Sequence, residues 1–322
     1  MPAQNDWRGP TMNRLIVIIG PTAVGKTKIS IDLAKRFDTQ IISGDSMLVY
    51  RGMDIGTAKP DMREREGIVH HLIDILDPDQ EFNVVDFQQY AQKLITVINN
   101  DNRIPILAGG TGLYVRALLE GYQFNQAPSD EKLRQKLTDL AKQYGNQYLH
   151  NLLQQVQPPT AARLHPNDQR RIIRALEVYY LSGETISREK TATNELLFDA
   201  VVIGLTMERA ALYDRINRRV DQMIEQGLVD EVARLLQQGV PPSCQAMQGI
   251  GYKEIVEYLL ADQDLITATD QLKQATRNFA KRQLTFYRRM PYITWYNVDD
   301  FEEYNNMLET IYNNVAGKFG VR

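Results

Sequence analysis

Short apolar runs alternate with amphipathic stretches over the first 121 residues of the chain. The run Leu15–Ile19 is rich in β-branched residues and ends at Gly20, which is typical of a buried parallel strand. The other elements predicted here are helices at 26–36 and 84–99 and strands at 40–42, 71–76 and 104–108. Strands and helices that alternate at this spacing indicate βαβ units and a mainly parallel sheet.

The pattern changes after Gly121. Only helical periodicity is present from about residue 129 to 182, interrupted by Pro158-Pro159 and His165-Pro166, and it predicts a helical insertion. A β-rich segment at 200–205 returns the chain to the sheet. The remaining predicted elements are helices at 208–225, 229–238, 253–260 and 265–289 and a last strand at 292–296.

These shifts predict an α/β fold in which helices flank a parallel sheet and an all-helical domain is inserted. We expect a flexible tail at 1–13, a core built from 14–121 and 198–322, and an insertion at 122–197.

Composition narrows the class of protein. The chain has 322 residues, with 37 Lys and Arg against 40 Asp and Glu, so its formal net charge is −3. This balance argues against a protein that holds nucleic acid by charge alone, although it permits a local basic groove. No apolar run near the start is long enough to span a membrane. The one cysteine, Cys244, excludes an intrachain disulfide and a Cys-based zinc site, and it indicates a cytoplasmic protein with a reduced thiol.

A phosphate-binding loop follows the first strand. The motif G-x-x-x-x-G-K-[ST] is matched by Gly20, Pro21, Thr22, Ala23, Val24, Gly25, Lys26 and Thr27. Glycines let the backbone approach phosphate oxygens, and the following helix N-terminus adds positive potential. Lys26 adds a cation, and Thr27 is placed to ligate Mg²⁺. The motif predicts a di- or triphosphate ligand on a nucleotide-kinase-like P-loop core, but it does not establish phosphoryl transfer.

An acidic partner for magnesium is harder to assign. Asp74 lies within the predicted strand at 71–76 and Asp77 directly follows it, which makes both candidates, yet neither ends a clean apolar run and either is equally a turn carboxylate. His70 and His71 lack Cys or acidic partners at metal-ligand spacing, so we expect ordinary histidines there.

Asp45 follows the short strand at 40–42. It is therefore expected at the carboxyl edge of the sheet, beside the phosphate loop, where a carboxylate is able to accept a proton from a nucleophile. On composition alone, an Asp that caps a turn is the favoured explanation of this residue.

Four motifs carry a resemblance to a known family. In chain order they are Gly20–Thr27, Asp45–Pro60, Gly109–Tyr114 and His165–Asp168 with the following Arg170, Arg171, Arg174, Ala175, Leu176 and Glu177. Two weaker ones are Arg215–Arg219 and Gly249–Glu254. Together they span about residues 14–296, and over this range the chain resembles the tRNA dimethylallyltransferases, also called tRNA isopentenyltransferases.

The resemblance implies transfer of a dimethylallyl group from dimethylallyl diphosphate to N6 of the adenosine 3′-adjacent to the anticodon, position 37, in tRNA. It implies that Asp45 is the general base, that Thr111 and Arg219 hold the diphosphate, and that Mg²⁺ is the cofactor. The physics agrees, because adenine N6 is a weak nucleophile and departing diphosphate develops negative charge.

The resemblance also implies that the insertion and the late basic helix hold the anticodon stem-loop. The expected tRNA-binding residues are Asp45, Ser46, Met47, Leu48, Gln169, Arg170, Arg171, Arg174, Lys273, Arg277, Lys281 and Arg282. With one cysteine the chain lacks the zinc finger of some relatives. We expect a cytoplasmic monomer without membrane contact.

Three alternatives remain at this point. A transferase that acts on free adenine nucleotide to make a cytokinin would share the phosphate loop and Asp45, but it has no use for the insertion. A small-metabolite kinase explains the phosphate loop but not the Asp45–Pro60 stretch. A nucleotide-switched RNA-binding module ranks last, because no base-reading motif accompanies the loop.

Overall fold

The apolar run near the start of the chain forms strand β1 (Arg14–Ile19), which is buried on both faces in the computed structural model. Leu15 and Val17 pack into one hydrophobic core, whereas Ile16 and Ile18 pack into another. Burial on both faces is the reason that the run is continuously apolar rather than alternating. The structure describes residues 12–124, 130–185, 188–189, 196–261 and 263–321, so the predicted tail lies outside it up to residue 11.

β1 belongs to a six-stranded sheet with the order β3-β2-β4-β1-β7-β8, in which every paired neighbour is parallel. This confirms the predicted α/β class. The other strands are β2 (Ile41–Ser43), β3 (His70–His71), β4 (Ile106–Gly109), β7 (Asp199–Thr206) and β8 (Ile293–Asn297). Because all of them run the same way, the loops after β1, β2 and β4 meet at one edge.

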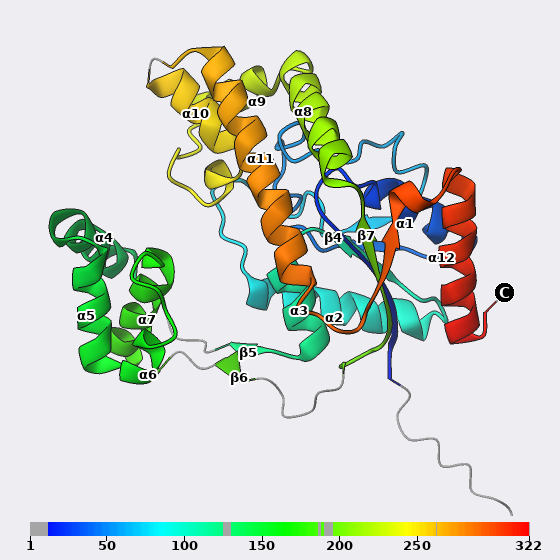
Figure 1. The fold of residues 1–322 in the computed structure, drawn as a ribbon, viewed down its shortest axis with the longest axis horizontal. Helices are drawn as coiled ribbons and strands as arrows, with labels where there is room; N and C mark the ends of the chain where they lie inside the picture. The colour runs from blue at the N-terminus through cyan, green and yellow to red at the C-terminus, as the bar shows by residue number, and fades with distance from the viewer. Residues whose placement is uncertain (1–11, 125–129, 186–187, 190–195, 262, 322) are drawn as a thin grey trace, which may run out of the picture. The chain divides into compact units, whose positions relative to one another are not determined.

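Helices cover both faces of this sheet (Figure 1). On one face lie α1 (Lys26–Arg36) and α12 (Tyr304–Phe319), which share a core with Ile16 and Ile18. On the other face lie α2 (Val84–Asn100) and α3 (Gly112–Glu120), which share the core that contains Leu15 and Val17.

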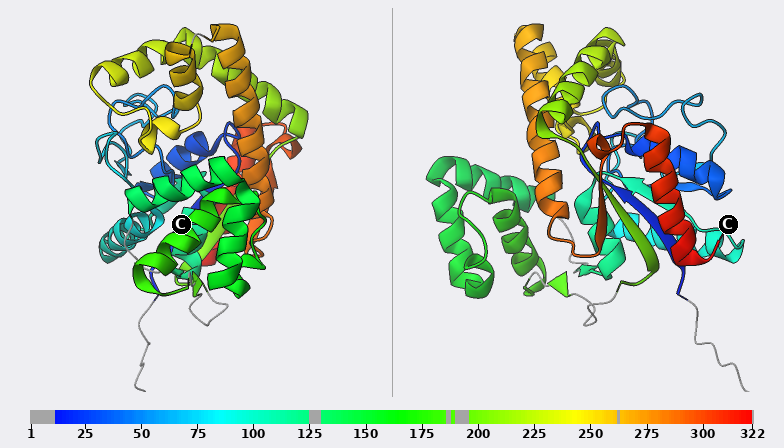
Figure 2. Two further views of the ribbon diagram at one scale, coloured as in Figure 1. Left: turned by 90° about the vertical axis from the view of Figure 1, so that its left-hand side faces the viewer. Right: turned by 45° about the vertical axis from the view of Figure 1, so that its right-hand side comes forward.

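The later helices pack against one another beyond the carboxyl edge of the sheet. They are α8 (Arg209–Glu225), α9 (Leu228–Gln237), η1 (Ala246–Gln248), α10 (Tyr252–Leu260) and α11 (Leu265–Tyr287). A short turn, η2 (Val298–Asp300), precedes α12. Figure 2 shows α11 as a long helix. It contacts α8, α10 and α3.

The chain divides into two compact units, one made of Met1–Gly121 and Glu195–Arg322 and the other of Tyr122–Asn194. The second unit contains α4 (Glu131–Tyr144), α5 (Asn146–Val156), α6 (Pro158–Ala161) and α7 (Gln169–Ser182). Its own core includes Leu137, Leu153 and Ile172. It also holds a short antiparallel pair of strands, β5 (Gln123–Phe124) with β6 (Arg188–Glu189). The expectation of a purely helical insertion is therefore corrected.

Two predictions about individual elements need correction. The strand predicted at 71–76 is wrong, because β3 ends at His71 and the backbone then turns through positive φ at Leu72 (60°) and Asp74 (56°). An isolated parallel bridge joins Leu76 to Tyr50. Helix α12 has no counterpart among the predicted elements, although Met307, Ile311 and Val315 give it a buried stripe.

Candidate functional site

The phosphate loop closes tightly between β1 and α1. Gly20 and Gly25 have φ values of 153° and 107°, and a Cβ on Gly20 would lie 2.6 Å from the carbonyl oxygen of Leu205. Lys26 Nζ donates hydrogen bonds to the carbonyl oxygens of Gly20 at 3.0 Å and Pro21 at 2.8 Å. Because the N-cap of α1 is a glycine, no side chain occupies the first N–H groups of the helix, and they remain available to an anion.

Asp45 lies two residues beyond β2, at the same edge of the sheet. Its Oδ1 accepts the Met47 N–H at 2.9 Å, which fixes the carboxylate in a turn. Burial raises the pKa of the Asp45 carboxyl above its ordinary value, whereas the Met47 N–H and the charge of Lys26 oppose that rise. A buried carboxylate with a raised pKa is suited to accept a proton.

Asp45, Lys26 and Arg219 line one pocket of about 550 Å³. Burial lowers the pKa of the Lys26 ammonium to about 8, with Asp45 opposing the shift and Arg219 adding to it. Burial likewise lowers the pKa of Arg219, against the charge of Glu64. The predicted site residues that line this pocket are Thr22, Ala23, Gly25, Lys26, Thr27, Asp45, Leu48 and Arg219.

Other predicted site residues do not line this pocket. Gly20, Pro21, Val24, Ser46, Met47 and Thr111 are not among the described residues that line it. The Thr111 hydroxyl accepts the Ser46 N–H at 3.0 Å and lies 3.3 Å from the Ser46 hydroxyl, to which it donates. In this structure, Thr111 therefore holds the turn that carries Asp45.

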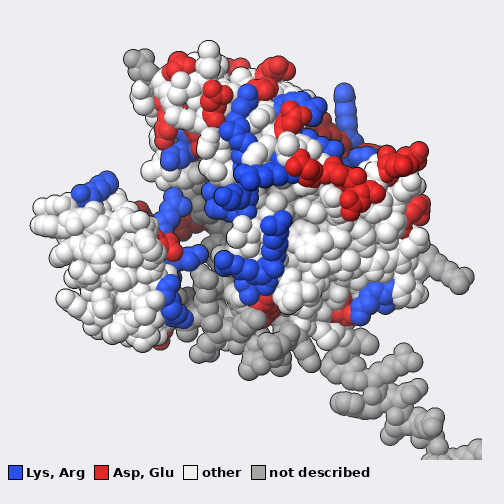
Figure 3. Space-filling model, in the orientation of Figure 1, with Lys and Arg blue, Asp and Glu red and all other residues white. Residues whose placement is uncertain are grey.

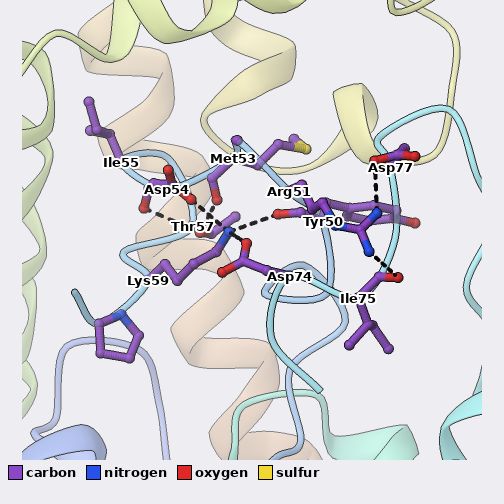
Figure 4. Close-up of polar contacts among 12 residues, drawn as sticks. Tyr50, Arg51, Met53, Asp54, Ile55, Thr57, Lys59, Asp74, Ile75 and Asp77 are labelled. Atoms are coloured by element: carbon purple, nitrogen blue, oxygen red, sulfur yellow. Dashed lines mark hydrogen bonds and ion pairs between the residues drawn. The ribbon is translucent and has the colours of Figure 1, made fainter. Parts of the chain in front are cut away.

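The candidate magnesium carboxylates lie elsewhere. Asp74 accepts a hydrogen bond from Lys59, whose ammonium also bonds Asp54 Oδ1 and the Tyr50 carbonyl oxygen, each at 2.7 Å (Figure 4). Asp77 pairs with Arg51 at 2.9 Å. Neither carboxylate is among the described pocket-lining residues.

The cluster around Lys59 explains part of the Asp45–Pro60 motif. The Lys59 side chain is only 4% exposed, so its charge requires the acceptors that surround it. By joining Tyr50, Asp54 and Asp74, it holds the loop whose Thr57, Ala58 and Pro60 line the pocket.

The predicted tRNA-binding residues of α7 differ in their surroundings. Arg170 is exposed, and Arg171 pairs with Asp168 at 3.1 Å on the surface. Arg174 instead contacts the buried carboxylate of Glu177 at 2.5 Å, which Arg134 also contacts at 2.7 Å. Gln169 is the first residue of α7. Arg174 is thus engaged in holding the second unit together.

The predicted tRNA-binding residues of α11 also fall into two groups, one paired with α8 and one exposed. Lys273 pairs with Asp221 of α8 at 2.6 Å, and Arg277 donates to Asn217 Oδ1 at 2.6 Å. Lys281 and Arg282 are exposed and line a shallow pocket with Phe286 and Arg289. Figure 3 shows Lys and Arg side chains gathered over α11 and α8 on this face of the molecule.

Sequence analysis missed a buried glutamine at the site. Gln283 of α11 is 5% exposed, accepts the Thr22 N–H and donates to the carbonyl oxygen of Gly110. One signal was available, because Leu272, Ala280, Gln283 and Tyr287 form the buried stripe of α11. A polar residue on such a stripe needs a buried partner.

Proteins of known sequence are similar to this chain over nearly their full length. A family model described as IPP transferase matches residues 48–290. A protein of Geobacillus thermodenitrificans named tRNA dimethylallyltransferase is 49% identical over 95% of this chain and 97% of its own length. A protein of Halalkalibacterium halodurans with the same name is also 49% identical, over 95% of this chain and 97% of its own length.

Solved structures are similar as well. The crystal structure of a tRNA isopentenylpyrophosphate transferase from Bacillus halodurans is 48% identical, with a TM-score of 0.72 over 95% of this chain and 96% of that one. A eukaryotic dimethylallyltransferase acting on tRNA is 30% identical, with a TM-score of 0.77 over 96% of this chain and 80% of that one.

Proposed function

The chain belongs to the IPP transferase family, and we propose that it transfers a dimethylallyl group from dimethylallyl diphosphate to N6 of adenosine 37 in tRNA. The products are N6-(dimethylallyl)adenosine and diphosphate. The observation that carries this proposal is a single pocket that places the Asp45 carboxylate with the phosphate loop, Lys26 and Arg219.

The two sides of this pocket match the two changes in the reaction. As the N6 lone pair forms a bond to C1 of the allyl group, the C1–O bond breaks and its electrons leave with diphosphate. The loop N–H groups, Lys26 and Arg219 are positioned to stabilise that developing charge. Asp45 accepts the N6 proton, which removes the positive charge that attack would leave on nitrogen.

The site suits a Mg²⁺ ion that is bound mainly by the substrate diphosphate rather than by a cage of protein ligands. No group of three or more His, Cys, Asp or Glu suited to a metal occurs among the described residues. Mg²⁺ commonly takes one or two protein oxygens and completes its shell with substrate phosphates and water. We propose Thr27 as its protein ligand, since this side chain lines the pocket. When bound, the ion would offset charge on the leaving diphosphate.

The RNA substrate requires a surface outside the pocket. We propose that exposed Arg170, Lys281 and Arg282 contact its phosphates, because their charges face solvent rather than a buried carboxylate.

No described helix has the length and apolar character needed to cross a membrane. We place the protein in the cytoplasm as a monomer that acts on the anticodon stem-loop.

A transfer assay tests this function. Labelled dimethylallyl diphosphate with Mg²⁺ and unmodified tRNA should give labelled tRNA, whereas AMP offered at the same concentration should remain unlabelled. Comparable labelling of AMP would favour the cytokinin alternative. Consumption of ATP with formation of a phosphorylated metabolite would favour a kinase.

A further inference from the structure

The side-chain amide of Gln283 joins two loops of the site. Its Oε1 accepts the backbone N–H of Thr22 in the phosphate loop at 2.9 Å. Its Nε2 donates to the carbonyl oxygen of Gly110, in the turn after β4, at 2.8 Å. Since one partner is a donor and the other an acceptor, only this orientation of the amide satisfies both.

Gln283 also lies close to the proposed base. A Cβ on Gly110 would come within 2.6 Å of Gln283 Nε2 and 3.7 Å of Asp45 Oδ2. Gly110 is therefore packed between the amide and the carboxylate, and any side chain at this position would displace the amide. The glycine and the glutamine form one closely fitted contact beside Asp45.

The order of the strands gives this contact its effect. β2, β4 and β1 are neighbours in that order, and they carry Asp45, Gly110 and the phosphate loop respectively. The Gly44 N–H donates to the Ala108 carbonyl oxygen at 2.8 Å, which fixes the end of β2 against β4. Gln283 supplies the corresponding link from the β4 turn to the phosphate loop.

We infer that Gln283 is a positioning residue, which sets the separation between the anion-binding loop and the Asp45 carboxylate. The inference rests on the proposed function and adds a residue to which that function assigns no role. Gln283 acts through the loops and makes no contact with the reacting atoms in this account. Its neighbours Lys281 and Arg282 serve RNA binding from the exposed side of the same helix.

The variant Gln283→Met tests the amide while it preserves length and apolar packing. We expect kcat to fall by about 10- to 100-fold, because a displacement of about 1 Å at a catalytic site has effects of this size. The KM for dimethylallyl diphosphate and the Kd for tRNA should change by less than about threefold. The matched control is Gln271→Met, the same substitution at an exposed position of α11, which should leave all three values unchanged.

The outcomes separate this inference from the function itself. A wild-type chain that fails to label tRNA would contradict the proposed function. A wild-type chain that labels tRNA, with Gln283→Met equally fast, would overturn the positioning role, as would a loss confined to tRNA affinity. Thermal unfolding of both variants shows whether each is folded.

A second variant displaces the amide without replacing it. Gly110→Ala should push Gln283 Nε2 aside and lower kcat by a similar factor. The single variant Gln283→Ala and the double variant Gly110→Ala/Gln283→Ala complete a cycle with Gly110→Ala, in which the losses should be far from additive, because both substitutions disrupt the same contact. Additive losses would show that Gly110 and Gln283 act independently and would overturn the inference.

Discussion

The hydroxyl of Tyr252 donates a hydrogen bond to the Glu231 carboxylate at 2.6 Å, and both side chains are buried. The same carboxylate accepts three consecutive backbone N–H groups from Asp54, Ile55 and Gly56, at 3.0, 2.9 and 3.1 Å. A buried anion is thus satisfied by four donors. It anchors the loop that lines the candidate active site to α9 and α10.

Replacement of Glu231 by Gln should weaken that anchor. The amide of Gln presents N–H groups where the loop requires acceptors, so we expect the free energy of unfolding to fall by about 2–3 kcal/mol. Urea unfolding followed by fluorescence measures this change as a lower midpoint. Tyr252→Phe, which removes one donor of the four, should have a smaller effect. Equal stability of Glu231→Gln and wild type would show that the loop does not depend on the carboxylate.

The pH dependence of transfer should report the pKa of the Asp45 carboxyl. Burial raises its pKa, and the carboxylate accepts a proton only when ionised, so kcat/KM should rise with pH and level off above that pKa. The acidic limb should therefore lie above the range of an ordinary Asp, about 3.9. Measurement of kcat/KM for dimethylallyl diphosphate against pH, with saturating tRNA and Mg²⁺, tests this expectation. An acidic limb at the ordinary value would argue against a buried base.

Arg174 should matter more to stability than to RNA binding. Burial raises the pKa of the Glu177 carboxyl, but Arg174, the Asp130 N–H and Arg134 outweigh burial and hold the pKa below its ordinary value. This contribution is present above the unfolded-state pKa of about 4.3 and is lost as pH falls through the folded value.

Arg174→Ala should therefore destabilise α7 at neutral pH by roughly 1.5 kcal/mol, whereas Arg170→Ala should not. Hydrogen exchange of the α7 amides measures the difference directly. The gap between the two variants should narrow in acid, where Glu177 is protonated. Unchanged exchange in Arg174→Ala would return Arg174 to the RNA-binding set.

The exposed cations of α11 should account for part of the salt dependence of tRNA binding. Lys281→Ala should weaken binding and reduce the slope of log K against log salt by about 0.7–0.9, the value for one lost phosphate contact. Lys318→Ala on α12, where the lysine pairs with Asp199, serves as the control and should leave the slope unchanged. Equal slopes for all three proteins would place the RNA elsewhere.

Local sequence was sufficient where the signal is local. The run Leu15–Ile19 and the loop up to Thr27 have fixed spacing and strong periodicity, so the central strand and the tight loop that follows it could be predicted. Asp45 could be placed because a residue after a parallel strand must lie at the carboxyl edge.

Contacts between distant segments could not be predicted in this way. Lys59 meets Asp74 only because the chain turns after β3, which changes Asp74 from a candidate magnesium ligand into an ion-pair partner. Arg174 looked like one member of a basic cluster because the burial of Glu177, three residues later, depends on packing against α4, whose Arg134 contacts the same carboxylate. Gln283 and Thr22 are 261 residues apart and meet only in the folded chain.

The single-turnover rate of Asp45→Asn tests the central claim most directly. With dimethylallyl diphosphate and tRNA bound beforehand, transfer should be slower than wild type by about 10²- to 10⁴-fold, the usual effect of losing a general base. The affinity for tRNA should be retained. A rate within a few-fold of wild type would contradict the assignment of Asp45 as the group that accepts the N6 proton.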